Sequence, residues 1–114
     1  MSLRIQKRGE ELYYVALVIN DDQIILFGND CPSLIACKYS IDSIRANATD
    51  FSKYELITSC GGKYHCKLKG SDGKEIAQSE IFNSKDECYA IIDLVRRSIP
   101  YAIIENTQKL YNFN

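Results

Sequence analysis

The sequence predicts a single α+β domain built from two tandem repeats, in which strands are followed by a helix. Three observations predict it: a well-capped amphipathic helix late in the chain, strand segments bounded by turn residues, and recurrence of the same pattern after 51 residues. A chain of 114 residues can bury a core without disulfides or metals. The predicted sheet is mostly antiparallel, with both helices on one face.

The clearest element is a helix over residues 85–98. Ser84 and Glu87 are spaced as a capping box, in which the serine hydroxyl accepts from an amide of the first turn and the glutamate reaches back to the serine amide. Pro100 ends the helix, because it lacks an amide hydrogen and clashes with the preceding turn. Apolar side chains at i, i+3, i+4 and i+7 draw one stripe, at Cys88, Ile91, Ile92 and Val95.

The strands are predicted from segments rich in β-branched and aromatic residues, bounded by turn residues. Asp72-Gly73, for example, is typical of a tight hairpin. A second helix is predicted from a cap at Ser33 to about Asn47. The predicted strands cover residues 4–7, 13–19, 23–27, 54–58, 64–69, 75–79 and 103–109.

The two halves of the chain align without a gap when one is shifted by 51 residues. Tyr13 then meets Tyr64, and the two cap serines meet each other. Because strands, hairpin, cap and helix face all stay in register, the pattern indicates a tandem duplication. We expect repeat 1 at about 1–51, repeat 2 at about 52–109 and a C-terminal tail at 110–114.

Four segments of the second half carry a family resemblance: residues 62–69, 72–74, 79–85 and 94–100. They resemble the YegP-like family of uncharacterised bacterial domains. The resemblance covers nearly the whole chain, because the first half follows as a diverged copy. It implies β-β-β-α-β units that share one sheet and exchange their C-terminal strands, and it implies no activity or site.

Composition argues against several classes of protein. A net charge of −1, with both signs interspersed, argues against a protein that coats nucleic acid or an anionic membrane. No apolar segment approaches the ~20 residues of a membrane span, and residues 1–7 do not resemble a signal peptide. Five cysteines, an odd number without a secretion signal, are expected to be reduced. We therefore expect a cytoplasmic protein without a cofactor.

The thiols give the second function hypothesis, a redox or stress-responsive protein using Cys31, Cys37 or Cys88. Cys37 and Cys88 lie on the apolar stripes of their helices, where core packing is the commoner role and a disulfide between them is the alternative. Cys31 precedes a helix N-terminus, whose dipole favours a thiolate. His65 and Cys66 leave a strand on opposite faces, which argues against a shared metal ion. No catalytic constellation is visible, so we do not expect an enzyme.

The leading hypothesis is a non-catalytic binding or assembly module that acts through the open sheet face, with a homodimer or an unidentified protein as partner. In the first half this face is expected to be apolar, and exposed apolar patches usually mark binding surfaces. Alternatively, the tail at 110–114 folds back over it. A weaker hypothesis is anion or nucleic-acid binding by His65, Lys67 and Lys69, although lysines on a solvated sheet face are commoner. The expected contacts are Tyr14, Ala16, Val18, Ile24 and Leu26.

Overall fold

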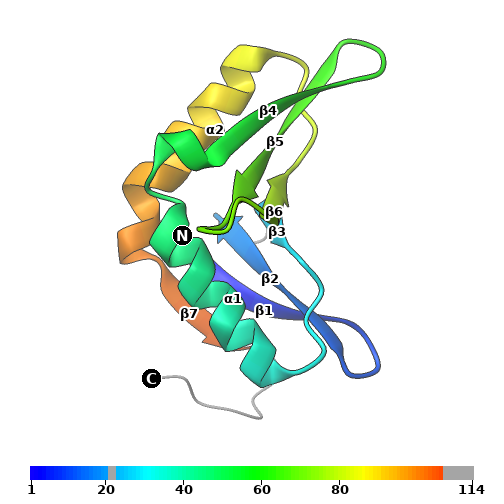
Figure 1. The fold of residues 1–114 in the computed structure, drawn as a ribbon, viewed down its shortest axis with the longest axis vertical. Helices are drawn as coiled ribbons and strands as arrows, with labels where there is room; N and C mark the ends of the chain where they lie inside the picture. The colour runs from blue at the N-terminus through cyan, green and yellow to red at the C-terminus, as the bar shows by residue number, and fades with distance from the viewer. Residues whose placement is uncertain (21–22, 107–114) are drawn as a thin grey trace.

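The computed structural model describes residues 1–20 and 23–106, which form one seven-stranded sheet with two helices packed on one face (Figure 1). Two 3-10 turns, η1 (Phe51–Lys53) and η2 (Ile99–Tyr101), follow the helices. The helices are α1 (Leu34–Asn47) and α2 (Lys85–Ser98). The strands are β1 (Ser2–Gly9), β2 (Leu12–Ile19), β3 (Gln23–Gly28), β4 (Tyr54–Ser59), β5 (Lys63–Lys69), β6 (Glu75–Ser79) and β7 (Ile103–Asn106).

The strands follow the order β4-β5-β6-β3-β2-β1-β7 across the sheet. Neighbouring strands are antiparallel except β1 and β7, which are parallel. The strand that follows α2 therefore completes the sheet beside the first strand of the chain. The two halves of the sequence meet at the centre, where β3 pairs with β6. The predicted α+β class and mostly antiparallel sheet are confirmed.

Both helices begin at the serine caps that the sequence predicts. The hydroxyl of Ser84 accepts from the amide of Glu87 at 3.2 Å, and that of Ser33 accepts from the amide of Ala36 at 3.1 Å. The Glu87 carboxylate meets the Ser84 hydroxyl at 3.5 Å. These bonds satisfy amides that have no partner inside the helix, so each helix starts at a defined residue.

The core lies between the sheet and the helix layer. Alternate residues of the strands point into it, because successive side chains of a strand leave on opposite faces. The α1 stripe supplies Cys37, Ile41 and Ile44, and α2 supplies Ile92 and Val95. The largest fully buried side chains that the sheet adds to this core are Leu3, Ile5, Val15, Leu17, Ile25, Leu26 and Leu68.

A β-bulge changes which residues of β3 face the helices. The pairing between β2 and β3 shifts register between Leu17 and Val18, so that Ile25 is an extra residue on β3. As a result Ile25 and its neighbour Leu26 both enter the core, each 1 % exposed. The expectation that Leu26 lies on the open face is therefore wrong, because strict alternation does not hold across a bulge.

Element boundaries differ from the predictions mainly by one or two residues at strand ends. Both helices have the predicted ends, while β1 begins earlier and ends later than predicted. Part of the last predicted strand is present as β7, and the remainder, together with the predicted tail at 110–114, lies outside the described residues. Within the described part of the chain, no helix is long and apolar enough to span a membrane.

Candidate functional site

The face of the sheet opposite the helices carries a row of residues in register across all seven strands. The middle of the row is apolar, and both ends are charged. At one end Arg4 Nε lies 3.1 Å from a carboxylate oxygen of Glu105. From β7 to β4 the row consists of Glu105, Arg4, Ala16, Phe27, Gln78, Lys67 and Glu55.

The structure brings together only part of the predicted contact set. Tyr14 and Ile24 lie on this open face and are half-buried. Ala16 and Val18 are 0 % and 2 % exposed, so neither offers much surface. Phe27, which sequence reasoning left out, takes the place expected for Leu26 because of the bulge. The bulge forms only when β2 and β3 pair, so it could not be predicted from the local sequence. The apolar character of Phe27 was the only signal that it could belong to the contact set.

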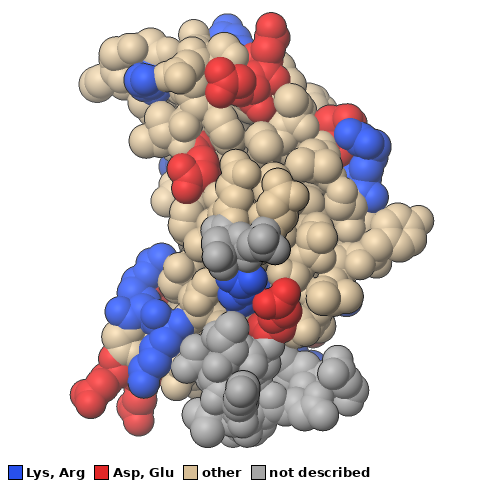
Figure 2. Space-filling model, turned by 180° about the vertical axis from the view of Figure 1, so that it is seen from behind, with Lys and Arg blue, Asp and Glu red and all other residues tan. Residues whose placement is uncertain are grey.

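Phe27 lies at the centre of three adjoining depressions of about 330, 410 and 390 Å³. The hairpins β1–β2 and β4–β5 project on the side away from the helices, and from behind the outline is hollowed between them (Figures 1 and 2). We call these depressions the open-face groove. Its principal lining residues are Ile24, Phe27, His65, Gln78, Glu80 and Ile81.

One end of the open-face groove is polar and held by side-chain contacts. The guanidinium of Arg8 lies 4.1 Å from the ring centroid of Tyr14 and forms an ion pair with Asp30. The Tyr14 ring stacks on Phe27 with centroids 6.4 Å apart. Arginine over an aromatic face is favourable because the ring quadrupole attracts the cation. These contacts hold the Tyr14 ring against Phe27, which lines the groove.

The predicted anion-binding row is already partnered. Lys67 Nζ lies 3.2 Å from Glu75, and Lys69 Nζ lies 3.0 Å from Glu55. The hydrogen bond from Lys69 lowers the pKa of the Glu55 carboxyl. His65 Nδ1 lies 3.2 Å from the hydroxyl of Ser59. Because each lysine is opposed by a carboxylate, this part of the face has little free positive charge for an anion.

The three thiols proposed as reactive are all buried. Burial raises the pKa of Cys31, and raises that of Cys37 to about 12 and that of Cys88 to about 11. Burial therefore opposes the thiolate expected at Cys31. Cys31 adds to the rise in the pKa of Cys37, and Cys66 adds to that of Cys88, so the buried thiols form two neighbouring pairs that the sequence did not predict.

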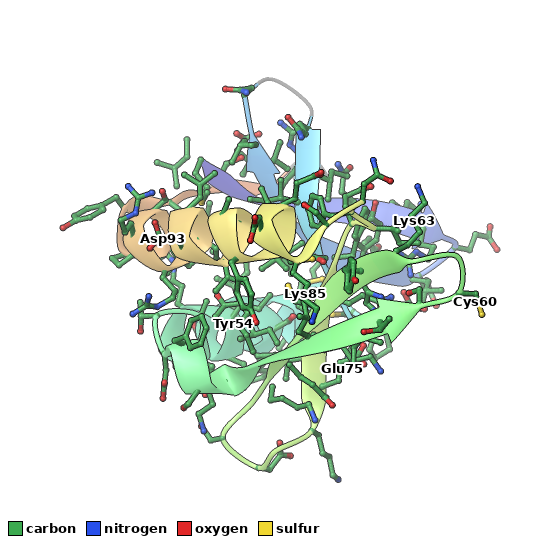
Figure 3. All side chains as sticks on the ribbon, turned by 90° about the horizontal axis from the view of Figure 1, so that it is seen from above. Tyr54, Cys60, Lys63, Glu75, Lys85 and Asp93 are labelled. Carbon is green, nitrogen blue, oxygen red and sulfur yellow. The ribbon has the colours of Figure 1, made fainter. Side chains whose placement is uncertain are left out.

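Cys60 has a different setting from the buried thiols. It is exposed and projects from the β4–β5 hairpin, where Lys63 also lies (Figure 3). Gly61 and Gly62 adopt positive φ values of 77° and 72°, which lets the chain reverse there. In residues 1–20 and 23–106, no group of three or more His, Cys, Asp or Glu side chains is placed to hold a metal ion.

Comparison with known proteins places this fold in a family. The model of a domain of unknown function, DUF1508, matches residues 60–105. A UPF0339 protein of Pseudomonas aeruginosa is 31% identical over 98 residues, which are 86% of this chain and 89% of that protein. This chain belongs to the UPF0339 family. The resemblance to YegP-like domains seen in the sequence is confirmed.

Solved structures agree with the UPF0339 assignment at the level of fold. The solution structure of E. coli yegP, a protein of unknown function, has a TM-score of 0.83 at 19% identity and covers 93% of this chain and 91% of its own. That of a UPF0339 protein of Shewanella oneidensis has a TM-score of 0.85 at 15% identity and covers 99% and 97%. The function of the family is unknown, so function must be argued from the site.

Proposed function

We propose that this UPF0339 protein is a non-catalytic binding module that engages a protein partner through the open-face groove. The observation that carries the proposal is the set of three adjoining depressions that share Phe27. Protein interfaces typically have an apolar centre and a polar rim. The row across the sheet has the same order, with Ala16 and Phe27 between charged ends.

Ile81 supplies an exposed apolar side chain at the edge of the open-face groove. It is 65% exposed, although full burial of such a side chain contributes about 1.5–3 kcal/mol. The segment that carries it is held on both sides, by the end of β6 at Ser79 and by two backbone bonds between Tyr64 and Phe82. Ile81 is thus positioned in advance, which reduces the entropy lost on binding.

The two halves of the sheet differ on this face in a way that favours a protein partner. Positions 51 apart carry Tyr14 and His65, Ala16 and Lys67, and Phe27 and Gln78. The first half is apolar, while the lysines of the second half are held in ion pairs. A net charge of −1 also gives no support for nucleic acid. The partner that fits is a second copy or another protein with an apolar contact surface.

Site-specific photo-cross-linking tests this function. A photoreactive amino acid replaces Ile81 or, as a matched control, Tyr39, which is 69% exposed on the outer side of α1. After irradiation in the cells that make the protein, we expect a discrete cross-linked species from position 81 and none from position 39. Phe27→Asp in the position-81 protein should abolish it. Equal cross-linking from both positions, or none from 81, would contradict the proposal.

We also infer that the fold arose by tandem duplication, with repeats at about 1–51 and 52–109 that exchange their C-terminal strands. α1 and α2 have equal length and begin 51 residues apart. The bulge recurs at the same spacing, between Leu68 and Lys69, as does the bridge Tyr13–Cys31 in Tyr64–Phe82. β7, after the second helix, pairs with β1, and β4, after the first, pairs with β5.

Reciprocal contacts in the helix layer support the same inference. Arg45 of α1 donates to the carbonyl of Ala102, which follows α2. Arg96 of α2 donates to the carbonyl of Thr49, which follows α1, at 3.2 Å. The two arginines are 51 residues apart. Each repeat therefore uses the same position to bind a backbone carbonyl just after the helix of the other repeat.

A further inference from the structure

A second type of cavity, beside α1 rather than on the open face, opens onto a pair of thiols. It measures about 270 Å³, and one wall is the buried side chain of Cys31. Cys31 and Cys37 belong to the same buried cluster, and their thiols are near enough for each to shift the pKa of the other, with Cys37 0 % exposed. The remaining lining residues are Asn29, Asp30, Pro32, Ala36, Ser40, Ser43 and Ile76.

Backbone bonds hold both cysteines in place. Cys31 exchanges two with Tyr13, at 2.9 and 2.6 Å. The amide of Cys37, in the first turns of α1, bonds to the carbonyl of Ser33 at 3.1 Å. The Cys31 sulfur also lies 3.4 Å from the carbonyl oxygen of Asn29. The proximity of the two cysteines is therefore set by the backbone of the fold.

We propose that Cys31 and Cys37 form a modification site that hydrogen peroxide, entering the cavity, oxidises to an intramolecular disulfide. The Cys31 sulfur attacks one peroxide oxygen, the O–O bond breaks, and water leaves after taking up the thiol proton. This gives a sulfenic acid at Cys31. The Cys37 sulfur then attacks the Cys31 sulfur, the S–O bond breaks, and a second water leaves. Two thiols lose two electrons in total, and one peroxide gains them.

The surroundings assign the order of attack. Cys31 lines the cavity, whereas Cys37 does not line it and is 0 % exposed. Burial raises the pKa of Cys31, and the neighbouring Cys37 and Ser40 side chains offset part of this rise, while Cys31 raises the pKa of Cys37 further. Since the thiolate is the nucleophile, Cys31 reacts first and Cys37 resolves the sulfenic acid. Burial also makes the reaction slow compared with that of an exposed, acidic thiol.

Peptide mapping tests the site directly, because trypsin leaves both cysteines in one fragment. No lysine or arginine lies between Arg8 and Lys38, so residues 9–38 form one tryptic peptide with Cys31 and Cys37. The full chain is reduced, freed of reductant, treated with hydrogen peroxide, and alkylated in denaturant. We expect this peptide to lose two hydrogen atoms and carry no alkyl group, while Cys66 and Cys88 become alkylated. A fully alkylated 9–38 peptide after prolonged treatment would overturn the proposal.

Two serine variants test the order of attack and do not depend on the disulfide being stable. Cys37→Ser should accumulate a sulfenic acid at Cys31, detected by a dimedone adduct. Cys31→Ser should leave Cys37 reduced. Circular dichroism must show that both variants are folded, and exposed Cys60 serves as the internal measure of peroxide exposure. If Cys37 of the Cys31→Ser protein forms the dimedone adduct as fast as Cys31 of the Cys37→Ser protein, the assignment of Cys31 as the first thiol to react is contradicted. The thiol cavity borders the open-face groove at Asn29 and Asp30, but neither cysteine lines the groove, so either proposal can fail alone.

Discussion

At the residue scale, Gly28 shows how closely the strands approach behind the open-face groove. It follows Phe27 at the end of β3, and a Cβ at this position would lie 2.9 Å from the carbonyl oxygen of Val15. Real Cβ atoms do not approach backbone oxygens so closely, so a larger residue must push the strands apart. The sequence suggested only a break in the strand pattern at this glycine, because the contact is with a residue of another strand.

Gly28→Ala is therefore expected to destabilise the fold by about 1–3 kcal/mol, the usual cost of overpacking. Gly9→Ala is the control, because no atom lies within 4 Å of a Cβ built there. Urea unfolding measures both free energies. Equal values for the two variants would contradict the close approach at Gly28.

The thiol of Cys37 gives a prediction for the pH dependence of stability. Its pKa rises from an ordinary value of 9.0 to about 12 on folding, so the folded state holds its proton more tightly. This contribution is complete below about pH 9 and is lost as pH rises toward 12. Between pH 8 and 10.5, in reductant, the unfolding free energy should fall more steeply for the wild type than for Cys37→Ala. Parallel pH profiles would show that Cys37 does not contribute.

At the element scale, both helices begin at a serine N-cap. The hydroxyls of Ser33 and Ser84 each accept from an amide of the first turn. Their caps and α2's apolar stripe are local features, which is why the sequence predicted both helix boundaries. The bulge in β3 is not local, since it depends on pairing with β2, and it moved Leu26 into the core and Phe27 onto the open face.

Replacing either cap serine by alanine should lower the unfolding free energy by about 1 kcal/mol. Ser98→Ala is the matched control, because the side chain of Ser98 makes no cap hydrogen bond. Thermal unfolding followed by circular dichroism compares the three variants. If the Ser84→Ala variant has the same melting temperature as the wild type, the cap of α2 does not stabilise the protein.

At the scale of the whole molecule, the two halves are joined through the sheet as well as through the chain. β7 comes from the second half but pairs with β1 of the first half, where Arg4 meets Glu105. The repeat and the family resemblance predicted the fold from sequence because they span the chain. The groove could be predicted only in part, since it forms where β3 and β6 meet and depends on the bulge.

Removal of β7 should therefore destabilise the first half, although β7 lies far from it in sequence. We expect a chain ending at Tyr101 to unfold at lower urea than a chain ending at Asn106, which keeps β7. Hydrogen exchange should show the largest loss of protection in β1, because its backbone groups lose their partners. Loss of protection confined to α2 would show that the pairing of β7 with β1 does not stabilise the first half.

Whether a partner binds the open-face groove can be decided by amide hydrogen exchange of the isotope-labelled protein, with and without an excess of extract from the cells that make it. Binding through the open-face groove predicts slower exchange in the strands around Phe27 and in the segment with Ile81. The exposed outer side of α1, around Tyr39, should exchange at an unchanged rate. Slowing confined to the helix layer, or no slowing in any segment at saturating extract, would contradict the claim that the open sheet face is the binding surface.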